Sequence, residues 1–281
     1  MILRRLLIGA LLALGLTYLF VLAALWSAQQ SLIYPAPKGE QLLPAGFEDV
    51  TLKTADGLDL AAAWHEGASD KPVLVFFHGN GDNWAGGDRA TALLQKAGYS
   101  VLLPEYRGYG RNPGRPGEAG FYADGRAALA WLGERGIDAG RIVLIGNSMG
   151  SGTATQLASE GTVGGLLLIS PYASLPDVVA DRLWWLPARW LVRDKFDNQS
   201  KLGRIVAPVL ILQGSADTVV PPKQAARLAG ANPRARLVMF PGEDHSLAYS
   251  DTAQHAELQW LDALPPPLVY PTSQRQAPAG T

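Results

Sequence analysis

From residue 47 onward, the chain alternates short apolar runs with polar, glycine-rich segments. The runs 47–53 and 58–64 flank the turn sequence Thr-Ala-Asp-Gly and predict a β-hairpin. The later runs are mostly continuous rather than alternating, which is typical of strands that are buried on both faces. These six predicted strands lie at residues 73–77, 99–103, 141–145, 165–170, 208–213 and 235–240.

Segments of helical length and composition separate these strands, at residues 87–96, 119–134, 150–159, 221–228 and 246–261. Strands and helices that alternate in this way predict an α/β fold, in which a mostly parallel eight-stranded sheet carries helices on both faces. The hairpin would form the antiparallel edge of that sheet. We assign this domain to residues 47–264 and expect a short helical cap in the insert 171–206.

The segments on either side of this domain have a different composition. Residues 27–46 are rich in proline and glycine and predict a connector. Residues 265–281 are rich in proline and poor in apolar residues, and they predict a disordered tail.

Residues 1–26 predict a membrane-spanning helix. Arg4 and Arg5 precede the uncharged stretch 6–26, which would extend about 30 Å as a helix and so match the hydrocarbon core of a bilayer. A cleaved signal peptide has a shorter apolar region, and a cut after Ala28 would require a small residue where Trp26 stands. We therefore favour an uncleaved signal-anchor over export after cleavage. The basic residues before the stretch place the N-terminus in the cytoplasm and the domain on the outer side.

The composition excludes several classes of protein. With 24 Lys and Arg against 25 Asp and Glu, the chain lacks the basic excess that nucleic-acid binding requires. The absence of cysteine excludes a disulfide scaffold, a thiolate zinc site and a cysteine nucleophile. The chain has four histidines but no H-E-x-x-H, and it lacks a phosphate-binding G-x-x-x-x-G-K-S/T loop. We expect no metal, no organic cofactor and no nucleic-acid partner, and the oligomeric state stays open.

The segment Gly146-Asn147-Ser148-Met149-Gly150 carries the first chemical signal. It follows the predicted strand 141–145 and leads into the predicted helix 150–159. A G-x-S-x-G sequence can arise by chance among 31 glycines, but this strand–turn–helix setting is the one that presents a serine as a nucleophile. We therefore expect Ser148 to be the nucleophile of a hydrolytic site.

An acid and a histidine follow the next two strands in the order that a serine nucleophile requires. Asp217 comes shortly after the strand 208–213, and His245 comes shortly after the strand 235–240. Parallel strands bring their carboxyl ends to one edge of a sheet, so these loops can meet the loop of Ser148. We assign His245 as the base and Asp217 as its orienting acid.

Asp177 is the alternative acid, since it follows the strand 165–170. We favour Asp217 because it lies closer to the end of its strand, in a Gly-Ser-Ala-Asp turn. The loop His78-Gly79-Asn80-Gly81 follows the strand 73–77, where an oxyanion hole needs a backbone N–H. We expect the amides of Asn80 and Met149 to be its donors, and His78 to shape the loop.

These motifs, together with Glu105-Tyr106-Arg107-Gly108-Tyr109-Gly110, resemble the α/β-hydrolase superfamily over residues 47–262. Within it the chain is similar to membrane-anchored hydrolase-domain proteins, a group that includes depalmitoylases. The resemblance implies a serine hydrolase that cleaves carboxylic esters or thioesters through an acyl-enzyme, acting on acyl substrates that include lipids and lipidated molecules. Glu105 stands where relatives commonly have Asp, and Asn147 where Arg is common, so depalmitoylation itself does not carry over.

Two other functions stay open at this point. A serine aminopeptidase would use the same nucleophile, although no acidic cluster for a free amine is recognisable in the sequence. A non-catalytic binding module with this fold would ordinarily lack the serine or the histidine, and here both are present.

Three tryptophans of the insert, Trp184, Trp185 and Trp190, are the candidate substrate-binding residues. They could form an aromatic wall for an apolar acyl group close to the bilayer, with Arg182, Arg189 and Arg193 facing lipid headgroups. The alternative is that they pack the insert onto the sheet.

Overall fold

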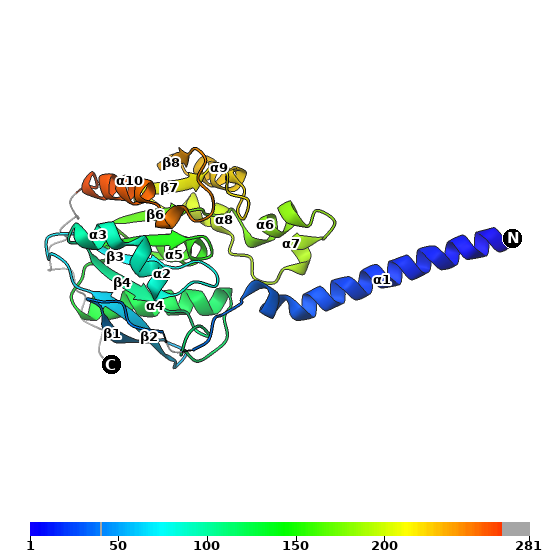
Figure 1. Cartoon of the computed structure of the whole chain (residues 1–281), viewed down its shortest axis with the longest axis horizontal. Helices are drawn as coiled ribbons and strands as arrows, with labels where there is room; N and C mark the ends of the chain where they lie inside the picture. Colours follow the sequence, from blue (N-terminus) through cyan, green and yellow to red (C-terminus); the bar gives the residue numbers. More distant parts are fainter. Residues whose placement is uncertain (40, 266–281) are drawn as a thin grey trace, which may run out of the picture.

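The computed structural model, which describes residues 1–39 and 41–265, contains one eight-stranded sheet in the order β1-β2-β4-β3-β5-β6-β7-β8 (Figure 1). β1 pairs with β2 and β2 with β4 in antiparallel register, and all other neighbours are parallel. The predicted fold class is thus confirmed. The strands are β1 (Glu48–Lys53), β2 (Asp59–His65), β3 (Val73–Phe77), β4 (Ser100–Pro104), β5 (Ile142–Asn147), β6 (Gly165–Ile169), β7 (Val209–Gly214) and β8 (Ala235–Phe240).

Alternate side chains of the central strands enter two separate cores, which explains their continuous apolar sequence. In β3, Val75 and Phe77 pack into one cluster with α4 (Glu118–Glu134), α5 (Gly150–Glu160) and α9 (Pro222–Ala231). Leu74 and Phe76 pack into the other, with α2 (Trp84–Ala90), α3 (Ala92–Lys96) and α10 (Asp251–Asp262). A strand between two such layers has no face left for polar residues.

The helix predicted at 87–96 is in fact two short helices. α2 begins earlier, at Trp84, because the Asn83 side chain accepts hydrogen bonds from the Ala85 and Gly86 amides and caps its N-terminus. The helix is interrupted at Thr91, whose hydroxyl bonds back to the Gly87 carbonyl.

The N-terminal helix α1 (Ile2–Ile33) is longer than the apolar stretch that predicts it. Its 32 residues would extend about 48 Å, and of the helices in the described residues it is the one long and apolar enough to cross a membrane. It continues past Trp26, so the first part of the predicted connector is helical. The change of polarity at Ser27 ends the apolar stretch, but the helix ends only before Pro35, since a residue that precedes proline avoids the helical conformation.

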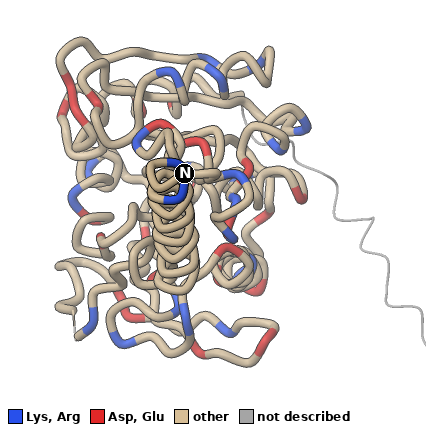
Figure 2. The backbone as a smooth tube through the Cα atoms, turned by 90° about the vertical axis from the view of Figure 1, so that its right-hand side faces the viewer, with Lys and Arg blue, Asp and Glu red and all other residues tan. Residues whose placement is uncertain are grey.

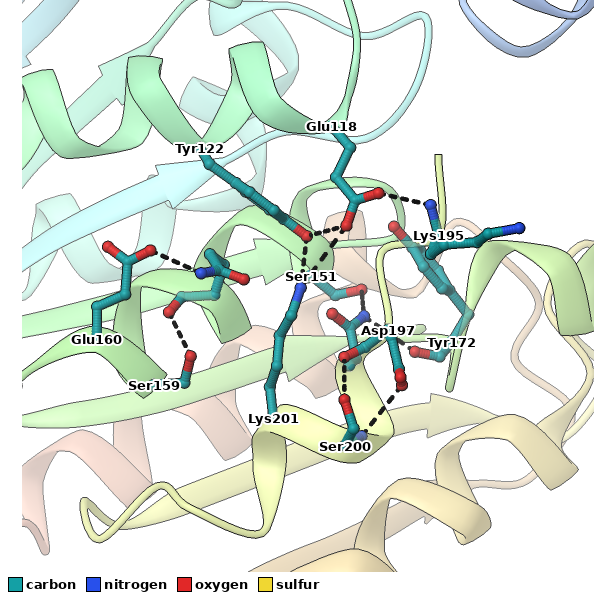
Figure 3. Close-up of polar contacts among 12 residues, drawn as sticks. Glu118, Tyr122, Ser151, Ser159, Glu160, Tyr172, Lys195, Asp197, Ser200 and Lys201 are labelled. Carbon is teal, nitrogen blue, oxygen red and sulfur yellow. Dashed lines mark hydrogen bonds and ion pairs between the residues drawn. The ribbon is translucent and has the colours of Figure 1, made fainter. Parts of the chain in front are cut away.

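The insert between β6 and β7 carries the predicted cap, built from α6 (Leu175–Arg182), α7 (Ala188–Leu191) and α8 (Asn198–Leu202). A polar cluster fastens its returning segment to the body (Figure 3). The Lys201 ammonium donates to the Tyr122 hydroxyl at 2.7 Å, and the Lys195 amide donates to Glu118 at 2.5 Å. The cap is therefore held against α4. The predicted tail lies outside the described residues from residue 266 onward.

Glu257 on α10 is the least expected residue of the core. Its side chain is completely buried, and neither of its oxygens has a hydrogen-bond partner within the described residues. Burial raises its pKa well above the ordinary value of a glutamate, so the folded protein holds this carboxyl in its neutral form.

The protonation of Glu257 predicts a pH-dependent stability. The unfolded chain loses this proton at an ordinary glutamate pKa while the folded chain keeps it. Stability contributed by the neutral form is therefore complete below that pKa and falls by up to about 1.4 kcal/mol per unit as the pH rises. Urea unfolding between pH 5 and 8 should show this fall in the wild type and a flatter profile in Glu257→Gln. The exposed Glu134→Gln should keep the wild-type slope; an unchanged slope in Glu257→Gln would contradict the account.

Candidate active site

The turn between β5 and α5 holds Ser148 in a backbone conformation that few L-residues adopt, with φ at +48°. The turn is tight because glycines flank it. A Cβ on Gly150 would lie 2.0 Å from the Phe77 carbonyl oxygen, and one on Gly146 would lie 2.6 Å from the Ser151 Cα. The serine thus sits at the carboxyl end of β5 and at the start of α5, directly beside the end of β3.

Three loops at this edge of the sheet bring Ser148, His245 and Asp217 together. His245 Nε2 lies 3.0 Å from the Ser148 Oγ, and His245 Nδ1 lies 2.8 Å from the Asp217 Oδ2. An ionised carboxylate only accepts hydrogen bonds, so Nδ1 carries a proton and Nε2 is free to accept one from the serine. This is the geometry of a serine, its base and the acid that orients the base.

The surroundings of Asp217 keep its carboxyl ionised. Burial acts to raise its pKa, but the hydrogen bonds from His245 and from the Val219 and Val220 amides outweigh burial and hold the pKa below its usual value. The Gln213 side chain also donates to its Oδ2, at 3.1 Å. Asp217 is therefore a fixed negative charge behind the imidazole.

Asp177, the alternative acid, lies elsewhere. It is in the first turn of α6, where its backbone amide and its carboxylate both bond the Ser174 hydroxyl. Its carboxylate also pairs with Arg227 at 3.1 Å and with Arg189 at 3.4 Å. The contacts with Ser174 are those of a helix cap. The carboxylate that contacts His245 is that of Asp217.

A small cavity of about 150 Å³ opens beside the serine, and Gly79, Asn80, Ser148, His245 and Tyr249 are among its lining residues. In the part of the chain that the structure describes, no intramolecular hydrogen bond occupies the backbone amide of Asn80 or of Met149. Both amides thus have the capacity to bind an oxygen next to Ser148. Within those same residues, no three His, Asp or Glu side chains gather where they could hold a metal ion.

His78 is buried behind this loop. Its Nδ1 contacts the Gly79 carbonyl at 2.8 Å and its Nε2 contacts Glu105 at 2.9 Å, so both nitrogens face acceptors. Burial acts to lower the pKa of His78, but the Glu105 carboxylate outweighs it and the pKa is raised. His78 therefore fixes the conformation of the loop. The sequence motif indicates this role for His78, while its partner Glu105, far along the chain, was not foreseen.

The side chain of Asn80 links this loop to α1, a contact that the sequence does not suggest. Its Nδ2 donates to the carbonyl of Ile33 at the end of α1, and its Oδ1 accepts from the Tyr109 hydroxyl at 2.7 Å. The backbone amide of Asn80 is thus positioned from two sides, and one of them is the N-terminal helix.

The three tryptophans of the cap do not form the expected aromatic wall of a cavity. Trp184 is 85% exposed and Trp190 is 90% exposed, and the cavity beside Ser148 is lined by other residues. Trp185 is partly covered by Tyr18 of α1, with its ring centroid 6.4 Å away. They do not pack the insert onto the sheet either, because all three side chains are among the exposed large apolar ones.

A mostly parallel sheet with a serine on a strand–helix turn, followed by an acid and a histidine at later strand ends, defines the α/β-hydrolase class. The family described as the alpha/beta hydrolase fold matches residues 72–200, and the family described as TAP-like protein matches residues 181–264. The protein Rv2307c of Mycobacterium tuberculosis, which is uncharacterized, is 40% identical over 237 residues, covering 80% of this chain and 83% of that protein. The chain therefore belongs to the α/β-hydrolase superfamily.

One more distant relative and two proteins of similar structure have named activities. The lysophosphatidylserine lipase ABHD12 of Danio rerio is 31% identical over 183 residues, covering 57% of this chain and 47% of that protein. The esterase Pf2001 of Pyrococcus furiosus has a TM-score of 0.63 at 23% identity, covering 80% of this chain and 95% of its own. A membrane phospholipase A described as a bacterial virulence factor has a TM-score of 0.58 at 19% identity, covering 92% and 99%. These two structures share the fold.

Proposed function

We propose that the protein is a membrane-anchored serine hydrolase that cleaves carboxylic ester or thioester bonds. The observation that carries this proposal is the continuous chain of contacts from the Ser148 hydroxyl through His245 to the buried Asp217. It is supported by relatives and neighbours named as a lipase, an esterase and a phospholipase. In this proposal α1 anchors the chain, with its N-terminus in the cytoplasm and the hydrolase domain on the outer side, because Arg4 and Arg5 precede the apolar stretch.

Catalysis would proceed by acyl transfer. The Ser148 Oγ attacks the carbonyl carbon while His245 Nε2 takes its proton, and the Asp217 carboxylate stabilises the resulting imidazolium. The amides of Asn80 and Met149 would bind the oxyanion of the tetrahedral intermediate, near the N-terminus of α5. The imidazolium then protonates the departing alkoxide or thiolate. Water then attacks the acyl-enzyme while His245 takes its proton. The imidazolium returns that proton to the Ser148 Oγ as the carboxylic acid leaves.

An amidase or aminopeptidase is the second candidate, since a puromycin-hydrolyzing peptidase of Mycobacterium tuberculosis has a similar structure, with a TM-score of 0.63. The only carboxylate among the residues that line the described cavity is Asp82, and it already accepts a hydrogen bond from the Tyr249 hydroxyl at 2.5 Å. This single carboxylate, already engaged by Tyr249, does not form the acidic cluster that would bind a free amine. Parallel assays with p-nitrophenyl esters and aminoacyl p-nitroanilides separate the two functions, and ester hydrolysis should dominate.

Replacement of the nucleophile tests the proposed chemistry. Purified Ser148→Ala should lose about a thousandfold or more in turnover of a p-nitrophenyl ester, because the remaining groups bind the substrate but form no acyl-enzyme. Ser159→Ala, on the far end of α5, is the matched control and should keep wild-type turnover. Wild-type activity in Ser148→Ala would refute the assignment.

The two candidate acids predict opposite outcomes for a pair of variants. Asp217→Asn should lose about a thousandfold or more in kcat, because an amide behind the imidazole no longer favours the tautomer that accepts the serine proton. Asp177→Asn should stay close to the wild type in kcat, since its contacts are with Ser174 and two arginines. If the pair behaves the other way round, the orienting acid is Asp177.

A further inference from the structure

The second half of α1 is docked on the cap rather than extended freely from the body. The Tyr18 hydroxyl donates to the Trp185 carbonyl at 3.0 Å. The Arg193 guanidinium lies 3.7 Å from the Trp26 ring, and the Arg193 amide donates to the Gln29 side chain at 2.9 Å. Figure 1 shows α6 and α7 beside the end of α1 that joins the body. The second half of α1 and the cap are therefore packed against each other.

Between them lies an apolar groove of about 240 Å³. From α1 it is lined by Leu25, Leu32 and Ile33, and from the cap by residues that include Val179, Leu186 and Leu191. The polar lining residue is Gln29. Its Nε2 donates to the Leu191 carbonyl, and its Oε1 accepts from the Arg193 amide. Both ends of the Gln29 amide group are therefore engaged, and the other lining residues are apolar. Such a lining suits an acyl chain.

One hydrogen bond links the inner end of the groove to the cavity beside Ser148. Ile33 lines the groove, and its carbonyl accepts the hydrogen bond from the side chain of Asn80, which lines the cavity beside Ser148. Pro35, two residues further on, packs against Gly81 of the same loop. The groove therefore ends next to the loop that lines the cavity beside Ser148.

In the proposed topology, the outer end of the groove lies at the level of the membrane. We call residues 183–190 the cap tip; it carries the exposed side chains of Leu183, Trp184 and Trp190. Trp185 of this tip contacts Tyr18, about 12 Å along the helix before the apolar stretch ends at Trp26. A bilayer that surrounds this stretch also reaches the cap tip. Tryptophan is enriched at that interface.

On the face from which α1 projects, positive and negative charges are mixed around the helix. In Figure 2, which looks onto that face, basic and acidic positions are interspersed behind the helix, and basic residues also mark its near end. Such a face favours neither a strongly acidic nor a strongly basic macromolecular partner, so the occupant of the groove is identified by its apolar lining.

On the basis of the proposed hydrolase function, we propose that the groove between α1 and the cap holds the acyl chain of a membrane lipid ester, which enters sideways from the outer leaflet. The anchor is then one wall of the substrate site as well as a tether. The substrate class is a lipid with a long acyl chain in ester linkage. Within the groove, each added methylene should raise kcat/KM by up to about fourfold.

The experiment uses two tryptophan substitutions that fill the groove, one from the α1 wall and one from the cap wall. The full-length chain is reconstituted in vesicles of a dialkyl ether phosphatidylcholine, which has no acyl ester to hydrolyse, and hydrolysis of 1-palmitoyl lysophosphatidylcholine is compared with that of p-nitrophenyl acetate. Active sites are counted with a fluorophosphonate, so unfolded protein does not contribute. In Leu32→Trp and in Val179→Trp, the ratio of lysolipid to acetate kcat/KM should fall about tenfold or more. Ser27→Trp, on the opposite face of α1, should keep the wild-type ratio.

The outcomes separate this inference from the function on which it rests. A wild-type enzyme that hydrolyses acetate, with an unchanged ratio in both tryptophan variants, would overturn the groove and leave the hydrolase intact. If the enzyme hydrolyses a water-soluble palmitoyl-peptide thioester but not the lysolipid, the proposed lipid substrate is wrong. The substrate would then be a lipidated protein. No hydrolysis of acetate by the wild type would refute the proposed function itself.

Discussion

The close approach of Gly150 to the end of β3 is the constraint on which the rest of the site depends. A Cβ at this position would overlap the Phe77 carbonyl, so only glycine lets the start of α5 lie against the loop that follows β3. Ser148 takes up its left-handed conformation in this turn, and the start of α5 lies against the backbone of Phe77 and His78. The strain at Ser148 is of the order of 1–3 kcal/mol and is borne by the buried strands on both sides.

Much of the fold follows from sequence because burial on both faces leaves a clear signal. β3 contributes Val75 to one core and Leu74 to the other, so the strand is apolar throughout and easily recognised. Helix boundaries were harder, since they depend on single contacts. The side-chain cap of Asn83 and the break at Thr91 divide one predicted helix into two. The end of α1 was misplaced because Ser27 changes the polarity of the helix without ending it.

The site was predictable to the extent that topology determines it. Parallel strands bring their carboxyl ends together, so the order Ser148, Asp217, His245 already indicated one cluster. The choice between Asp217 and Asp177 rested on distance from a strand end, a weak signal that does not reveal that Ser174 and two arginines engage Asp177. The position of the tryptophans was beyond reach of the sequence, because it depends on where α1 docks on the cap.

The docking of α1 joins two features that look independent in the sequence. Asn80, which lines the cavity beside Ser148, is held through its side chain by the last carbonyl of α1, and the same helix end lines an apolar groove. If Ser148 is the nucleophile of this arrangement, a fluorophosphonate added to the folded full-length chain should form one adduct, and peptide mass spectrometry should place it on Ser148. An adduct on a neighbouring serine such as Ser151, or no adduct on folded protein, would contradict the account.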